Sequence, residues 1–118
     1  MHPQRIGLIA NTTKPRAAEV AGELRRQFER HGVQLEYEWA TAGLVGLESA
    51  LGVRELAREC DLLVVLGGDG TLLQALGEIE GRIPPMFGIN LGKMGFLTCL
   101  GAAQHLEAVE IIVEGLYT

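Results

Sequence analysis

The sequence lacks the features that define several classes of protein. It has 2 cysteines, Cys60 and Cys99, and neither belongs to a CxxC pair. Its 3 histidines, His2, His31 and His105, have no cysteine or acidic partner at the spacing of a metal site. This pattern argues against a disulfide framework and against a zinc site. No apolar run approaches the roughly 18 residues of a membrane span, and the run near the start is too short for a signal peptide, so we expect a cytoplasmic protein.

Basic residues are also few. The chain carries 10 Lys and Arg against 15 Asp and Glu, for a formal net charge of −5, and it has no long basic run. This balance argues against nucleic acid or a membrane surface as the main partner. A small anionic ligand remains compatible with it, because local backbone geometry can outweigh net charge. The length of 118 residues and the apolar content of 47% predict one domain, residues 1–118, with a single core.

Apolar runs alternate along the chain with segments of helical periodicity. Continuous runs predict buried strands, and the alternation of Val33, Leu35, Tyr37 and Trp39 with polar residues predicts a strand near the edge of a sheet. The predicted strands cover residues 5–10, 33–39, 61–66 and 86–90, and the predicted helices cover 53–59, 72–79, 104–116 and a segment with Pro15 in its first turn and Gly32 after its end. This order predicts a layered α/β domain, with a mostly parallel sheet, flanking helices and a ligand crevice at the carboxyl ends of the strands.

The turn Gly-Gly-Asp-Gly-Thr, residues 67–71, follows the most apolar predicted strand. Gly67, Gly68 and Gly70 permit positive φ and leave no Cβ between the backbone and a ligand, so the turn can offer N–H groups to phosphate at the start of a helix. It is not a Walker A loop, because no Lys-Ser/Thr pair follows, and the spacing of a dinucleotide fingerprint fails at Leu73.

A carboxylate inside such a turn needs an explanation. Phosphate repels Asp69 unless the carboxylate binds a bridging Mg²⁺ or accepts the proton of an attacking hydroxyl, and either role implies a nucleotide-dependent phosphotransferase. The alternative is that Asp69 only caps the following helix.

A second glycine-rich stretch, GINLGKMGFLT at residues 88–98, follows the next predicted strand. Asn90 could bind a ligand or cap its own loop. Lys93 could neutralise phosphate or stay solvated, and Phe96 could stack on a base or fill the core. The residue types leave each pair of roles open.

These two stretches, together with IGLIANTTKPRA at residues 6–17, resemble the NAD kinase family. Its enzymes transfer the γ-phosphate of a nucleoside triphosphate to the 2′-hydroxyl of the adenosine ribose of NAD. The Gly-Gly-Asp-Gly-Thr turn alone is shared with diacylglycerol and sphingosine kinases, and phosphofructokinases carry a close variant. The other two stretches narrow the resemblance to NAD kinases.

The resemblance implies a Rossmann-like or phosphofructokinase-like amino-terminal domain and a set of site residues. By it, Asp69 accepts the proton of the 2′-hydroxyl and, with Gly70, contacts NAD. The other implied residues are Gly67, Gly68 and Thr71 in the shape of the turn, Leu73 and Phe96 in the adenosine pocket, and Asn90 and Lys93 in nucleotide binding. The implied donor is ATP or polyphosphate, with Mg²⁺ held through the phosphates and Asp69 as a further candidate ligand. Gln74 departs from the basic residue that many members have there.

Family members continue into a second, mostly β domain that binds NAD, and no part of this sequence matches it. We therefore expect an amino-terminal fragment that is inactive alone and belongs to a homo-oligomeric enzyme. Two alternatives remain, a lipid or sugar kinase of the same superfamily and a non-catalytic nucleotide-binding or subunit-contact module.

Overall fold

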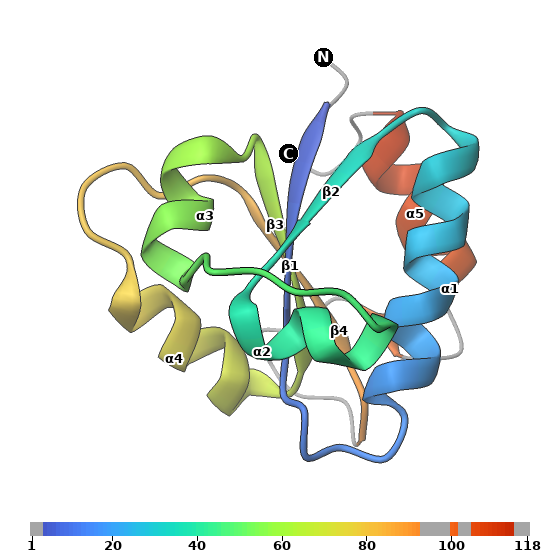
Figure 1. Cartoon of the computed structure of the whole chain (residues 1–118), viewed down its shortest axis with the longest axis horizontal. Coiled ribbons are helices and arrows are strands. Elements are labelled where there is room, and N and C mark those ends of the chain that lie inside the picture. Colours follow the sequence, from blue (N-terminus) through green and yellow to red (C-terminus); the bar gives the residue numbers. More distant parts are fainter. Residues whose placement is uncertain (1–3, 93–99, 102–104, 115–118) are drawn as a thin grey trace.

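A computed structural model describes residues 4–92, 100–101 and 105–114 of the chain. Its centre is a five-stranded sheet in the order β2-β1-β3-β4-β5, in which every neighbouring pair is parallel (Figure 1). The strands are β1 (Arg5–Ala10), β2 (Gln34–Tyr37), β3 (Leu62–Gly67), β4 (Met86–Asn90) and β5 (Leu100–Gly101). The parallel α/β class predicted from the sequence is confirmed.

Helices cover both faces of this sheet. They are α1 (Ala17–Arg30), α2 (Trp39–Ala42), the 3₁₀ turn η1 (Gly43–Val45), α3 (Val53–Glu59), α4 (Asp69–Glu78) and α5 (His105–Val113). α1 and α5 lie on one face, and α3 and α4 lie on the other (Figure 1). Successive residues of β3 alternate between the two layers, since Val64 packs toward α1 while Leu63 and Val65 pack toward α3. Burial on both sides explains the uninterrupted apolar sequence of this strand.

The predicted boundaries are close to those observed, with differences at the start of α1 and at the end of β2. α1 begins at Ala17, so Pro15 precedes the helix. β2 is an edge strand, as predicted, but it ends at Tyr37, and Trp39 begins α2 with 65% of its surface exposed. The placement of Trp39 in the strand was therefore wrong. The cause is local, because the Glu38 carboxylate accepts hydrogen bonds from the N–H groups of Ala40 and Thr41 and so caps a new helix.

The last helix agrees with its predicted pattern. α5 occupies residues 105–113, and Val109 and Ile112 are buried in the layer beside α1. Across the described parts of the chain, no helix combines the length and the apolarity that crossing a membrane requires.

Candidate functional site

The order of the strands locates the ligand crevice. β1 and β3 are neighbours, but the chain leaves them in opposite directions, over α1 to β2 and over α4 to β4. In doubly wound sheets the crevice lies outside the carboxyl ends of the two strands where the order reverses. The ends are in register, with Ala10 opposite Leu66 and Gly67 opposite Asn90. The segments that follow β1, β3 and β4 therefore start from one edge, and the Gly-Gly-Asp-Gly-Thr turn is one of them.

Gly67 is required by a close approach rather than by its φ angle. A Cβ built on Gly67 would lie 2.7 Å from the Cβ of Thr71 and even closer to the Thr71 hydroxyl. Positive φ occurs among the described residues only at glycines 32, 46 and 81. Gly67, Gly68 and Gly70 thus do not use the positive φ that the sequence allowed. A Cβ on Gly68 or Gly70 would meet no atom within 4 Å, so space is open beside both residues.

Asp69 is the first residue of α4 and is half-buried there. The N-cap position belongs to Gly68, which has an extended backbone and no side chain, so the interpretation of Asp69 as the helix cap is wrong. A carboxylate in the first turn still stabilises the helix by about 0.3–1 kcal/mol, because its negative charge interacts favourably with the helix dipole. The amides at the start of a helix point out along its axis, where they can hold anionic oxygens. The turn thus combines a helix N-terminus, an acidic side chain and two glycines with open space beside them.

The other predicted residues divide into three groups. Asn90 is 3% exposed, and its Oδ1 accepts a hydrogen bond of 2.7 Å from the N–H of Gly92, so it stabilises its own loop. Leu73 is 54% exposed on α4, one turn after Gly70 and on the same face. Lys93 and Phe96 lie outside the described residues.

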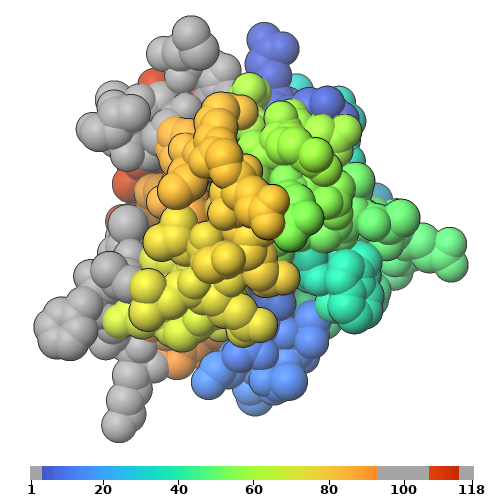
Figure 2. Space-filling view, turned by 90° about the vertical axis from the view of Figure 1, so that its left-hand side faces the viewer, coloured from blue at the N-terminus to red at the C-terminus, as the bar shows by residue number. Residues whose placement is uncertain are grey.

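A pocket of about 350 Å³ adjoins this edge and is called the edge pocket below. Its wall comes from the end of β1, the starts of α2 and α3, and one side of α4, whose surfaces meet on the face seen in Figure 2. The residues that line it are 9–12, 38–40, 52–53, 71, 74, 75 and 78. None of them is basic, whereas Glu38 and Glu78 are acidic. Thr71 belongs to both the turn and this pocket.

Hydrogen bonds attach the start of α2 to the edge of the sheet. Thr41 is fully buried, and its hydroxyl donates to Glu38 Oε1 at 2.7 Å and accepts from the N–H of Ala10 at 2.9 Å. The N–H of Glu38 donates to the carbonyl oxygen of Leu8 at 3.1 Å, and that of Trp39 donates to Leu51 at 2.8 Å. The backbone at Trp39 is therefore held in place although its side chain is exposed. Sequence reasoning missed this part of the site because Trp39 fitted the alternation of β2.

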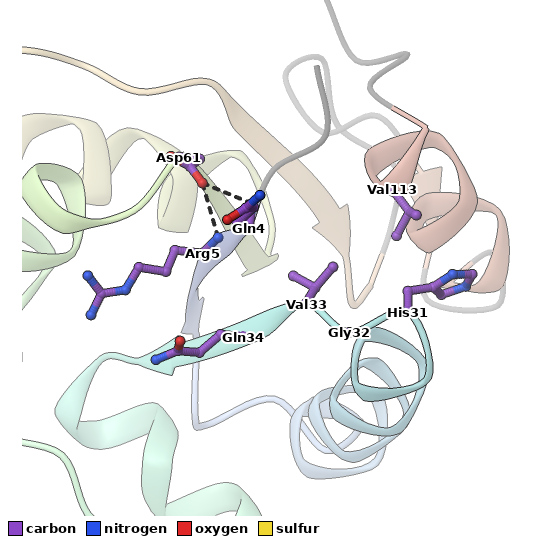
Figure 3. A pocket seen from close by; sticks show the side chains of 8 residues that line it. All are labelled: Gln4, Arg5, His31, Gly32, Val33, Gln34, Asp61 and Val113. Carbon is purple, nitrogen blue, oxygen red and sulfur yellow. Dashed lines mark hydrogen bonds between the residues drawn. The ribbon is translucent and has the colours of Figure 1, made fainter.

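A larger pocket, of about 870 Å³, lies at the opposite edge of the sheet, beside Gln4, Val33 and Val113 (Figure 3). Its acidic residue, Asp61, accepts hydrogen bonds from the backbone N–H groups of Gln4 at 2.9 Å and Arg5 at 3.1 Å. These bonds lower the pKa of Asp61 and fasten the start of β1. This pocket lies at the amino-terminal ends of the strands, away from the crevice of a doubly wound sheet.

In the part of the chain that the structure describes, no side chains are arranged as a complete set of metal ligands. This part contains no group of three or more His, Cys, Asp or Glu side chains that could hold a metal ion. Cys60 is buried in the core layer between the sheet and α3, and burial raises the pKa of its thiol to about 11.

The sheet order and the turn define a doubly wound α/β domain with a glycine-rich helix start at its switch point. Residues 6–117 match the family model described as ATP-NAD kinase N-terminal domain. The chain therefore belongs to this family, as the resemblance in the sequence implied.

Individual relatives agree with this assignment. An NAD kinase of Natranaerobius thermophilus is 36% identical over 115 residues, which are 96% of this chain and 40% of that protein. Among solved structures, an NAD kinase from Archaeoglobus fulgidus in complex with ATP is 25% identical with a TM-score of 0.68, over 94% of this chain and 38% of the other. Yeast NADH kinase complexed with NADH has the same fold, with a TM-score of 0.80 at 21% identity. The match covers 97% of this chain and 39% of the yeast chain. The chain thus spans about 40% of the length of its curated relatives.

Proposed function

We propose that this chain supplies the catalytic turn of an NAD kinase, which transfers the γ-phosphate of ATP or polyphosphate to the 2′-hydroxyl of the adenosine ribose of NAD. The observation that carries the proposal is the position of residues 67–71 at the switch point of the sheet, at the start of α4, in a chain of this family. The names of the relatives favour NAD over the lipid or sugar acceptors of the wider superfamily.

In this proposal the backbone of Gly68, Asp69 and Gly70 holds phosphate oxygens at the start of α4. The Asp69 carboxylate accepts the proton of the 2′-hydroxyl while that oxygen forms a bond to the γ-phosphorus. The bond from the γ-phosphorus to the bridging oxygen breaks, and the electron pair leaves with the nucleoside diphosphate. Leu73, with Phe96, contributes an apolar wall for the adenosine of NAD. Packing between Gly67 and Thr71 keeps the turn in position.

Magnesium fits the residues of this site without a protein cage. Mg²⁺ in phosphotransferases is held by substrate phosphates with one or two carboxylates and water, and Asp69 is the carboxylate that the turn offers. When bound, the ion neutralises charge on the transferred phosphoryl group.

The test is Asp69→Asn in the full-length protein that carries this chain. We expect kcat to fall by about 100-fold or more, because a general base acts mainly in the transition state, while the Kd of NAD stays within about tenfold. Asp61→Asn is the matched control, since Asp61 is the only other aspartate of the 118 residues and lies at the opposite edge of the sheet. Unchanged turnover in Asp69→Asn would remove this residue from the mechanism.

The substrate class has its own test. The full-length protein should phosphorylate NAD and leave diacylglycerol and hexose phosphates unchanged in the same assay. Activity on the lipid or the sugar without activity on NAD would reverse the assignment.

The 118 residues alone are proposed to be a nucleotide-binding half-site rather than an enzyme. They span about 40% of the related enzymes, and a half-open cleft leaves the reaction exposed to water. Calorimetry should therefore detect weak binding of NAD and ATP to this chain, and a kinase assay with the same chain should detect no phosphorylation of NAD. Turnover by the isolated chain would contradict this.

A homo-oligomeric, cytoplasmic enzyme is proposed for the full-length protein. Leu76 on α4 and Ile83 after it are 39% and 56% exposed, which is consistent with a surface covered by another domain or subunit. Light scattering should find the isolated chain more prone to association than the full-length protein, in which this surface is covered.

A further inference from the structure

Trp39 is a large apolar side chain that the core does not use. It is the only tryptophan of the chain, and 65% of its surface is exposed. Its backbone is nevertheless fixed, through its own N–H to Leu51 and through Glu38 to Leu8 of β1. An exposed aromatic ring on a fixed backbone can stack on a ligand at a low cost in entropy.

The pocket beside Trp39 excludes one kind of ligand group and suits another. No described residue of its wall is basic, and Glu38 and Glu78 make it acidic, so it repels phosphate. The amide of Gln74 and the carboxylate of Glu78 present hydrogen-bonding groups to a neutral polar ring, and a volume of about 350 Å³ is within the range of small-molecule sites. Bases stack on aromatic side chains, so an aromatic face beside hydrogen-bonding side chains suits a nucleobase.

The pocket and the catalytic turn share one helix. Thr71 lines the edge pocket and lies two residues after Asp69, and Gln74 follows one turn later. The span from Asp69 to Gln74 is about 7.5 Å along the helix axis. A ribose and a chain of phosphates can cover a distance of this order. Trp39 also lines a second hollow, with residues 43 and 47–50, but that hollow includes no residue of the turn or of a strand end.

We infer that the edge pocket holds the base of the nucleoside triphosphate donor, with Trp39 as the surface on which the base stacks. This inference rests on the proposed function and adds the location of the donor base and the residue that selects a nucleotide over a phosphate chain without a base. Trp39 is a binding residue here and takes no part in the proton transfer assigned to Asp69.

The experiment measures donor binding by calorimetry with the full-length protein, using ATP and inorganic tripolyphosphate as probes. Trp39→Ala should weaken ATP binding by about tenfold, the order expected when one stacked base loses its aromatic partner. Binding of tripolyphosphate, which has no base, should stay within twofold. Trp39→Phe should restore ATP affinity to within about threefold, because a phenyl ring can still stack. Leu47→Ala is the matched control, because Leu47 is an exposed apolar side chain, 39% accessible, that lines the second hollow beside Trp39 and does not line the edge pocket.

Three results would overturn the inference. They are unchanged ATP affinity in Trp39→Ala, an equal loss for ATP and tripolyphosphate, and no binding of ATP by the wild type. Circular dichroism of each variant establishes that it folds. This experiment measures binding and not turnover. Unchanged turnover in Asp69→Asn would therefore refute the proposed function without changing the measured effect of Trp39→Ala on ATP affinity.

Discussion

Gly67→Ala should destabilise the domain although it adds only one methyl group. The new Cβ would lie 2.7 Å from the Cβ of Thr71 and 3.1 Å from its Cγ2, and nearer still to its hydroxyl. Rotation of the Thr71 side chain cannot relieve the first contact, because that Cβ is fixed to the backbone of α4. Either the last residue of β3 or the first turn of α4 must move. Overpacking of this kind costs about 1–3 kcal/mol, and the lower entropy of the unfolded alanine variant offsets about 0.4–1 kcal/mol of it.

Gly68→Ala is the matched control one residue later. Its backbone has φ −128° and ψ −165°, which alanine can adopt, and a Cβ there would meet nothing within 4 Å. Alanine is a poorer N-cap than glycine, but the entropy gain has the opposite sign, so the free energy of unfolding should change by less than about 0.5 kcal/mol.

Urea unfolding followed by far-ultraviolet circular dichroism measures both variants. We expect the midpoint of Gly67→Ala to fall with an unchanged slope, and that of Gly68→Ala to stay near the wild type. Thr71→Gly completes a double-mutant cycle, because it removes the side chain that the new methyl group meets. The double variant should be more stable than the sum of the single changes by about 1 kcal/mol or more. Equal midpoints for the two alanine variants, or no coupling in the cycle, would refute the steric argument.

Two further predictions concern Asp61, at the amino-terminal ends of the strands, and Cys60, in the core layer beside α3. The backbone N–H groups of Gln4 and Arg5 lower the pKa of Asp61, so its stabilisation is present above the unfolded pKa of about 4 and is lost as the pH falls through the lower folded pKa. The difference in unfolding free energy between the wild type and Asp61→Ala should therefore be largest at neutral pH and shrink below about pH 4, and a difference independent of pH would contradict this. Burial raises the pKa of Cys60 to about 11, so in a Cys99→Ser background its alkylation by iodoacetamide at pH 8 should be at least about 100-fold slower than in urea. Equal labelling rates would show that the thiol is not buried.

Much of the fold could be predicted because both faces of the sheet are covered. Burial leaves a pattern that can be recognised within a single segment. Examples are the apolar run at residues 61–66 and the stripe of Val20, Leu24 and Phe28 on α1. Trp39 could not be placed in this way. Its alternation with polar residues continued that of β2, and only the capping bonds of Glu38 end the strand before it. The edge pocket was missed because it is formed by residues from four separate segments, which no single stretch of sequence brings together.

The sequence predicted where the residues of the turn lie along the chain, but it did not predict their backbone angles and contacts. Glycine at 67 suggested an unusual φ, but the observed reason is the approach of Thr71 across one helical turn, a contact that exists only once β3 and α4 are packed. Asn90 had two roles open, and its bond to Gly92 supports the structural one.

Packing explains some residues of the turn and leaves others unexplained, and this difference is informative. Gly67 and Thr71 fit one another, and exchanging either would disturb the first turn of α4. Gly70 has no such reason, because its Cβ position is open, its φ is not positive, and it lies inside a helix where glycine costs about 1 kcal/mol relative to alanine. Folding alone would favour alanine at residue 70. A glycine that costs stability beside an acidic side chain at a helix start is what the proposed site needs, because a ligand must approach the backbone there, so Gly70 is the position of the turn that the proposed function explains and folding does not.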